Sequence, residues 1–217
     1  AVITGVADSG LDVVDLGLIS RDMLVFEMGT EEHDGAVLVT GASCMSDEVA
    51  IQMFRGDATP MGLQNGLESV SHIARRPQSS RSGMAGRTHK RDIYEAYRSY
   101  VAKFALHVQP VKCVVDASFG MGSRVLPLIA EELPLDLVTV NFGEVDQEAL
   151  QGQEADGFPD TDALHNVRNS VASSSAQFGV IFDHQMSRAA FLDDTGSLLR
   201  PGHVGVLLAR ELLRRST

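Results

Sequence analysis

Short runs of apolar residues alternate along this chain with stretches in which apolar residues recur at helical intervals. Runs without a polar interruption are typical of strands that are buried on both faces. We expect such strands at 36–40 (Ala-Val-Leu-Val-Thr) and at 111–117. The same patterns predict further strands at 12–17, 137–141, 178–183 and 189–193, and helices at 63–75, 92–106, 124–133, 162–174 and 204–215. Strands that alternate with helices predict an α/β fold.

A change in composition divides the chain. Residues 77–88 (PQSSRSGMAGRT) are rich in Ser, Gly and Arg and poor in large apolar side chains, which is typical of a linker. We therefore predict an N-terminal module at 1–76, a linker at 77–91 and a C-terminal module at 92–217. The sequence begins at Ala1 without Met, so we expect the chain to be a piece of a longer protein.

Composition narrows the functional classes. The 217 residues are 44% apolar and 22% charged, as in ordinary globular proteins. No apolar run is long enough to span a bilayer, and a net charge of −11 argues against nucleic acid as a partner. Two cysteines, Cys44 and Cys113, exclude a disulfide framework. Without a signal peptide at its start, we expect the chain in the cytoplasm.

Charge is unevenly distributed. Residues 1–54 carry ten acidic side chains and one basic side chain, Arg21, whereas residues 71–112 carry nine basic and two acidic side chains. The basic stretch can be interpreted as a solvated linker and helix face. It can also be interpreted as a rim that binds anions, because clustered Arg and Lys attract phosphate. The sequence leaves both interpretations open.

Three loops are expected at the carboxyl ends of strands, where α/β sheets gather their ligands. The first offers the hydroxyl of Ser43 and the thiol of Cys44. The second, 118–123 (Ser-Phe-Gly-Met-Gly-Ser), is either a set of backbone donors for phosphate or a tight strand–helix turn. Cys113 starts a buried strand, which predicts a core position.

The third loop, 183–188 (Asp-His-Gln-Met-Ser-Arg), joins two strands that are expected to pair. It carries a carboxylate, an imidazole and a guanidinium. Asp183 and His184 would suit a divalent cation, and a polar pair satisfied at the strand end is the alternative. These loops alone do not define a reaction.

Several of these segments occur in an order that matches one enzyme family. Residues 34–43 (Asp-Gly-Ala-Val-Leu-Val-Thr-Gly-Ala-Ser) form a strand that leads to a serine, with Gly41 as an extra residue. Residues 114–122 form a strand with an aspartate and a Gly-x-Gly turn. Further matching segments are 55–60, 156–159 (Asp-Gly-Phe-Pro), 178–183 with Arg188, and 190–196. The chain thereby resembles the α-D-phosphohexomutase superfamily of phosphoglucomutases and phosphomannomutases.

The resemblance implies phosphoryl transfer on hexose phosphates through a phosphoserine, assisted by Mg²⁺ held by aspartates. It assigns the phosphoserine to Ser43, one metal ligand to Asp183 and a phosphate clamp to Arg188. It also implies two three-layer α/β/α modules, the first of them truncated. Residues 1–76 would be the C-terminal part of domain I, and residues 92–217 would be domain II.

The chain departs from the family pattern at its chemical positions. Cys44 stands where the family has histidine, and the lysine of an Asn-Gly-x-Lys element is lost near Met53. Gln185 and Ser187 stand where the family has the second and third aspartates of its metal loop. Because Mg²⁺ prefers charged oxygen ligands, we expect its binding to be weakened and the chain to be catalytically impaired. His184 would suit a softer metal such as zinc.

Two alternatives stay open. The chain would be part of an active mutase with unusual metal ligation, or a non-catalytic module that binds sugar phosphate or a protein partner. Whether this chain is an enzyme is therefore undecided by the sequence. Ser43 is either the surviving nucleophile or a small residue in a structural turn, and Cys44 as a replacement nucleophile lacks an evident histidine partner.

Overall fold

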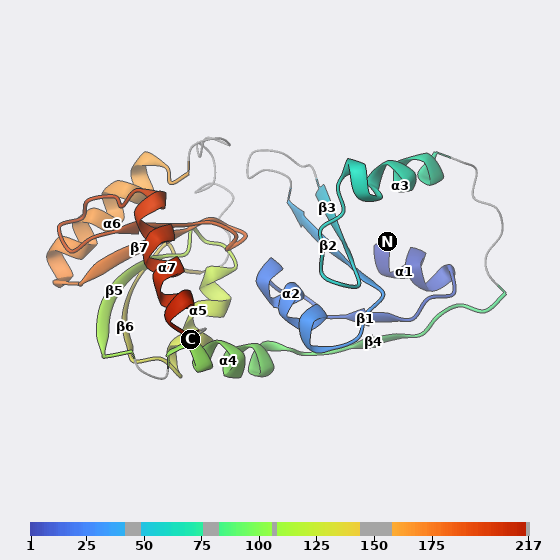
Figure 1. Cartoon of the computed structure of the whole chain (residues 1–217), viewed down its shortest axis with the longest axis horizontal. Coiled ribbons are helices and arrows are strands. Elements are labelled where there is room, and N and C mark those ends of the chain that lie inside the picture. The colour runs from blue at the N-terminus through green and yellow to red at the C-terminus, as the bar shows by residue number, and fades with distance from the viewer. Residues whose placement is uncertain (42–48, 76–82, 106–107, 144–157, 216–217) are drawn as a thin grey trace. The chain divides into compact units, whose positions relative to one another are not determined.

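The computed structural model describes residues 1–41, 49–75, 83–105, 108–143 and 158–215 (Figure 1). The chain divides into two compact units. The N-terminal unit is built from Ala1–Thr40 and Val49–Tyr97, and the C-terminal unit is built from Arg98 onward. Helix α4 (Tyr94–Ala102), followed by the short 3-10 helix η2 (Lys103–Ala105), contains the boundary between them.

A four-stranded sheet forms the C-terminal unit, with the strand order β6-β5-β7-β8. Its strands are β5 (Val111–Asp116), β6 (Leu135–Val140), β7 (Phe178–Phe182) and β8 (Ala189–Leu192). The central strand β5 pairs in parallel with β6 and β7, while β8 runs antiparallel to β7. The predicted pairing of 178–183 with 189–193 is therefore confirmed. Parallel neighbours bring the carboxyl ends of β5, β6 and β7 to the same edge of the sheet.

Two helices connect the parallel strands, α5 (Gly122–Ala130) and α6 (Thr161–Ser174). Helix α6 buries its apolar stripe on one face of the sheet, in a core of Val114, Ala163, Val167, Val171, Ala176, Ile181 and Leu192. The helix comes so close that a Cβ at Gly179 would lie 2.6 Å from Cγ1 of Val167. Residues Cys113, Val115 and Val180 alternate onto the other face and are also buried.

Helix α5 supplies the buried side chains Val125 and Ile129. The chain moves from β5 to β6 in one direction across the sheet and from β6 to β7 in the other. Right-handed crossovers in opposite directions require their helices to cover opposite faces. The C-terminal unit therefore has helices on both faces of its sheet, and the α/β fold expected from the sequence is confirmed. The last element is α7 (Pro201–Arg215).

Two separate pairs of strands build the N-terminal unit. Strand β1 (Val13–Asp15) pairs in parallel with β4 (Thr88–Lys90), and β2 (Gly35–Gly41) pairs with β3 (Val49–Arg55). Its helices are α1 (Val2–Asp8), α2 (Arg21–Thr30), the short 3-10 helix η1 (Leu63–Asn65) and α3 (Leu67–Ala74). Strand β4 lies in the segment that was expected to be linker.

Helix α2 holds half of the buried residues that the structure describes in this unit. Its N-cap is Ser20, whose hydroxyl accepts a hydrogen bond from the backbone of Met23 at 3.3 Å. Met23, Leu24 and Met28 are buried, and so is Glu27. The Glu27 side chain is only 2% exposed and pairs with Nε2 of His33 at 3.2 Å and with Arg91 at 3.4 Å. Arg91 follows β4 and also pairs with Glu31 at 2.5 Å, so it fastens that segment to α2.

The expectation of a strand buried on both faces at 36–40 is wrong. Strand β2 forms there, but its residues alternate between exposed and half-buried, and Val37 and Val39 are 39% and 50% exposed. Among the described residues, β2 pairs with β3 alone, and every second side chain of β2 is exposed, so these residues leave one face of the strand uncovered. The strand at 111–117 is buried as expected. No described helix is long and apolar enough to cross a membrane.

Candidate functional site

Two loops meet at the carboxyl edge of the C-terminal sheet. One is the turn between β5 and α5, and the other is the loop 183–188 that follows β7. The hydroxyl of Ser118 donates to the carbonyl of Phe182 at 2.7 Å, and the backbone N–H of Met121 donates to the carbonyl of His184 at 2.8 Å. A Cβ at Gly120 would lie 2.2 Å from that same carbonyl oxygen. Glycine at position 120 is therefore what allows the two loops to touch.

The turn after β5 uses its backbone donors inside the protein. The N–H groups of Phe119, Gly120 and Met121 donate to the carbonyls of Asn141, Ala117 and His184. Ser118 and Phe119 adopt left-handed backbone angles, with φ of 45° and 52°. Because these backbone donors are already engaged within the protein, residues 118–123 are better described as a tight strand–helix turn than as a set of donors for phosphate.

Asp116 lies at the end of β5, directly beneath this turn, and is completely buried. Its carboxylate accepts hydrogen bonds from the backbone of Ser118 at 2.7 Å and from the side-chain amide of Asn141 at 2.8 Å. Burial raises the pKa of Asp116, and these hydrogen bonds oppose the increase only in part. The sequence matched this aspartate to the family but did not single it out as a site residue. An acidic residue at the end of a buried strand was the available signal.

Asp183 is held by the loop that it begins. Oδ1 accepts hydrogen bonds from the backbone N–H groups of Ser187 and Arg188 at 2.6 and 3.2 Å. Oδ2 accepts from the hydroxyl of Ser187 at 2.8 Å and from Nε of Arg188 at 3.0 Å. Burial alone would raise the pKa of Asp183, but these four hydrogen bonds outweigh it and lower the pKa below its ordinary value.

Arg188 has a second contact beside the Asp183 carboxylate. Its guanidinium carbon lies 4.8 Å from the centre of the Phe158 ring, within cation–π distance. The Arg188 side chain is 57% exposed. With Nε bonded to Asp183, the two terminal nitrogens form no hydrogen bond with the residues that the structure describes. They make a planar fork that suits a phosphate or carboxylate.

The structure describes some of the predicted site residues and not others. Asp183, Gln185, Ser187 and Arg188 lie on one loop, and Nδ1 of His184 turns away to the carbonyl of Ser118 at 2.5 Å. Ser43 and Cys44 lie outside the described residues, as do Asp156 and Gly157 of the family motif. Cys113 is buried in the sheet as predicted, and burial raises the pKa of its thiol.

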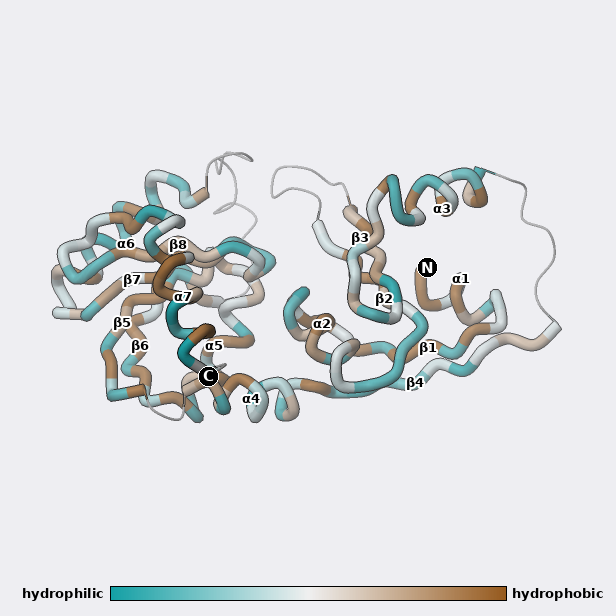
Figure 2. The backbone as a smooth tube through the Cα atoms, viewed as in Figure 1, coloured by the Kyte–Doolittle hydropathy of each residue, from teal (hydrophilic) through white to brown (hydrophobic). Residues whose placement is uncertain are grey.

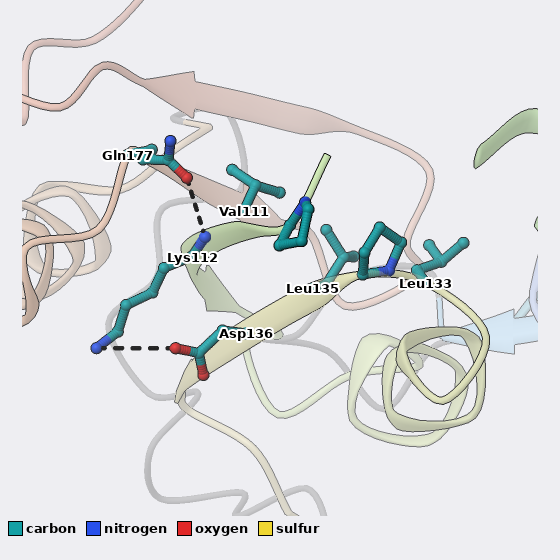
Figure 3. Close-up of a pocket in the computed structure, with 8 residues that line it drawn as sticks. Val111, Lys112, Leu133, Leu135, Asp136 and Gln177 are labelled. Atoms are coloured by element: carbon teal, nitrogen blue, oxygen red, sulfur yellow. Dashed lines mark hydrogen bonds and ion pairs between the residues drawn. The ribbon is translucent and has the colours of Figure 1, made fainter. Parts of the chain in front are cut away.

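A hollow of about 510 Å³ lies at the other end of the sheet, beside the first residues of β5 and β6 (Figure 3). There the backbone of Lys112 donates to the side chain of Gln177 at 3.1 Å. The Lys112 ammonium lies 3.9 Å from the Asp136 carboxylate. Two prolines, two leucines and Val111 form the rest of its wall. None of the predicted site residues lines this hollow.

No family model matches the chain. Three known proteins that are similar to it carry the names of phosphohexose mutases. The phosphohexose mutases of Xanthomonas campestris (strain B100) are 27% identical over 222 residues, covering 99% of this chain and 48% of the relative. A phosphoglucomutase of Neisseria gonorrhoeae is 24% identical and covers 98% of this chain and 45% of the relative. A phosphomannomutase of Vibrio cholerae is 21% identical, with 99% of this chain and 47% of the relative covered.

Solved structures give the same fold. A phosphoglucomutase/phosphomannomutase family protein of Burkholderia thailandensis superposes with a TM-score of 0.81 at 22% identity, covering 99% of this chain and 47% of that protein. A putative phosphomannomutase of Thermus thermophilus superposes with a TM-score of 0.72 at 18% identity, covering 96% and 48%.

These matches define the chain first as an α/β protein with the phosphohexomutase fold. The relatives then confirm the resemblance seen in the motifs and support membership of the phosphohexomutase superfamily, among phosphoglucomutases and phosphomannomutases. The chain spans about half the length of the relatives it matches.

Proposed function

We propose that this chain is a cytoplasmic, phosphoglucomutase/phosphomannomutase-like protein, of the family type that transfers a phosphoryl group within hexose phosphates through a phosphoserine, and that its own catalysis is impaired. The observation that carries the proposal is the state of the loop 183–188. Two of three expected carboxylates are replaced by Gln185 and Ser187. The third, Asp183, already accepts four hydrogen bonds from Ser187 and Arg188 of its own loop.

The residues of this loop do not fit Mg²⁺. A hard cation takes charged oxygens, and Gln185 and Ser187 supply only neutral ones. A carboxylate has about four lone-pair positions, and the four hydrogen bonds to Asp183 use that number. Mg²⁺ would have to displace the Arg188 guanidinium, which already supplies a positive charge beside the carboxylate. We therefore derive no step through the metal.

In the family assignment, Ser43 carries the phosphoryl group and Arg188 binds it. The exposed fork of Arg188 keeps the chemistry that this role needs. Two other groups of the family pattern are also missing. Cys44 stands in place of the histidine next to the serine, and the lysine near Met53 is lost. The chain has lost metal-binding carboxylates as well as this histidine and lysine. These losses support impaired catalysis rather than a change of substrate.

A coupled assay tests the proposal. The full chain would be supplied with glucose 1-phosphate, glucose 1,6-bisphosphate as primer and Mg²⁺, and the formation of glucose 6-phosphate would be followed through a dehydrogenase. We expect no turnover above that of Ser43→Ala. A turnover that Ser43→Ala abolishes would contradict the proposal and would indicate an active mutase with unusual metal ligation.

A second candidate function, a non-catalytic module that binds sugar phosphate, is favoured by Arg188 alone. Its guanidinium is oriented by Asp183 at 3.0 Å and by the Phe158 ring, yet it stays exposed. Calorimetric titration with glucose 6-phosphate in metal-free buffer would detect such binding. The module hypothesis predicts saturable binding that Arg188→Gln weakens, and the absence of binding would eliminate it.

A further inference from the structure

Asp116 is a completely buried carboxylate at the end of β5, a strand that is otherwise mainly apolar (Figure 2). A buried charge needs compensating hydrogen bonds, and Asp116 has them on both oxygens. Oδ1 accepts from the backbone N–H of Ser118 at 2.7 Å, and Oδ2 accepts from the side-chain amide of Asn141 at 2.8 Å. Because Asn141 follows β6, the carboxylate joins the turn after β5 to the end of the neighbouring strand. Apolar side chains fill such positions at a lower cost, so a charge here indicates a role beyond packing.

Ser118 links Asp116 to a third strand, β7. The backbone of Ser118 is left-handed, with φ of 45°, which is unfavourable for a residue with a Cβ. Its hydrogen bond to Asp116 stabilises that conformation. The Ser118 hydroxyl donates to the carbonyl of Phe182 at 2.7 Å, and Nδ1 of His184 donates to the carbonyl of Ser118 at 2.5 Å. The two residues that flank Asp183 are therefore both bonded to Ser118.

We propose that Asp116 is a positioning residue for the guanidinium of Arg188. Asp116 holds Ser118, and Ser118 holds the two residues that flank Asp183. Oδ2 of Asp183 then accepts a hydrogen bond from Nε of Arg188 at 3.0 Å, which orients the fork of the two terminal nitrogens. A fork binds phosphate through two parallel hydrogen bonds only when its plane is held in place. This role rests on the proposed function in one respect, that Arg188 binds the phosphate of a sugar phosphate.

A purely structural role for Asp116 predicts a different outcome, and Val171 provides the comparison. Val171 is 1% exposed and belongs to the core between α6 and the sheet. A Cβ at Gly179, near the first residues of β7, would lie 3.1 Å from Cγ2 of Val171, whereas the loop 183–188 follows the last residue of β7. Truncating either side chain should destabilise the C-terminal unit. Hydrogen bonds lead toward Arg188 from Asp116 and not from the side chain of Val171.

Solvent exchange of the Arg188 Nε–H group, followed by NMR in the full chain, tests the proposal without any ligand. Asp116→Asn keeps the shape of the side chain but leaves either the Asn141 amide or the N–H of Ser118 facing another donor. We expect the Nε–H exchange to become about tenfold faster in this variant, as its hydrogen bond to Asp183 is held less firmly. Val171→Ala is the matched control and should change the exchange less than about twofold, because it does not loosen the loop locally.

A reciprocal exchange of two side chains provides the rescue. Asp116→Asn/Asn141→Asp again places a donor opposite an acceptor, and the left-handed backbone of Asn141, with φ of 51°, also suits aspartate. We expect the Arg188 Nε–H exchange to return to within about threefold of the wild-type rate. Ser118→Ala removes the hydroxyl that bonds to Phe182, so it should accelerate the exchange as Asp116→Asn does, and it keeps the test available if Asp116→Asn does not fold.

Three results would overturn the proposal. One is an Nε–H exchange rate that Asp116→Asn and Ser118→Ala leave unchanged. Another is an equal acceleration by Val171→Ala, because the effect would then follow from lost stability alone. The third is a reciprocal variant that folds without any recovery of the wild-type rate. Titration with glucose 6-phosphate separates these results from the proposed function: a wild-type chain that binds none, but shows the expected exchange rates, refutes phosphate binding by Arg188 and supports its positioning by Asp116.

Discussion

The two units use the same kinds of residue to different effect. In the C-terminal unit, β5 has a neighbour on each side and β-branched residues are buried on both faces of the sheet, with Val114 and Ile181 beneath α6. In the N-terminal unit, the strand pair β2–β3 leaves Val39 and Ile51 each 50% exposed. An isolated strand pair is marginally stable in water. An apolar strand is therefore buried on both faces only where further layers cover it.

The largest predicted effect compares the same substitution in the two units. Ile181→Ala removes a side chain that is 1% exposed and should cost about 2–5 kcal/mol of unfolding free energy. Ile51→Ala removes a side chain that is 50% exposed and should cost less than about 0.5 kcal/mol. Urea unfolding followed by circular dichroism measures both. Equal costs would show that a further layer covers β3.

A smaller effect is expected at the buried carboxylate of the N-terminal unit. Among the described residues, Arg91→Met leaves the buried Glu27 with His33 as its remaining side-chain ion partner, which is unfavourable because a buried charge needs compensation. Because Arg91 is itself 41% exposed, we expect a cost of about 1 kcal/mol, which lowers the melting temperature of this unit by roughly 4–8 °C. Adding Glu27→Leu should restore most of the loss, since the uncompensated charge is then gone. A double variant no more stable than Arg91→Met would contradict this account, and Arg87→Met serves as the exposed control.

The smallest effects concern pH, where Asp183 and Asp116 act in opposite directions. A lowered pKa means that Asp183 stabilises the fold above its ordinary pKa, and this stability is lost as pH falls through the lower folded value. A raised pKa means that Asp116 costs stability as pH rises from its ordinary pKa through the higher folded value. Both windows meet near pH ~4.

Urea unfolding across pH in metal-free buffer separates the two groups. Asp183→Asn should flatten the acid limb below pH ~4, and Asp116→Asn should flatten the decline above it. The readout is the slope with pH, because the asparagines also change the baseline stability. If the unfolding free energy of either variant changes with pH as it does in the wild-type chain, that carboxylate does not contribute to the pH dependence.

Much of the C-terminal fold could be predicted from the sequence because its patterns are local. The apolar run at 111–117 and the helical spacing at 162–174 correspond to β5 and α6. Helix α2 was missed because Glu27 lies on its buried face, paired with Arg91 from a distant segment, and so hides the apolar period. The exposure of β2 was missed because a run of valines does not show whether another layer will cover each face of the strand.

The candidate site shows the same limit. Motif order was sufficient to bring Asp183 and Arg188 to one loop. It could not indicate that the hydroxyl of Ser187 and Nε of Arg188 would fold back onto the Asp183 carboxylate, because that depends on the turn geometry of the loop. Asp116 was matched to the family motif but was not singled out as a site residue, because the sequence does not show that its carboxylate is completely buried.

Calorimetric titration of the full chain with Mg²⁺ is the sharpest test of our proposal that the loop 183–188 does not hold this cation. The matched variant is Gln185→Asp/Ser187→Asp, which restores both carboxylates and removes the hydroxyl contact of Ser187 to Asp183. We predict no saturable binding by the wild-type chain at millimolar Mg²⁺ and a saturable site in the double variant. Tight, stoichiometric Mg²⁺ binding by the wild-type chain would contradict the account.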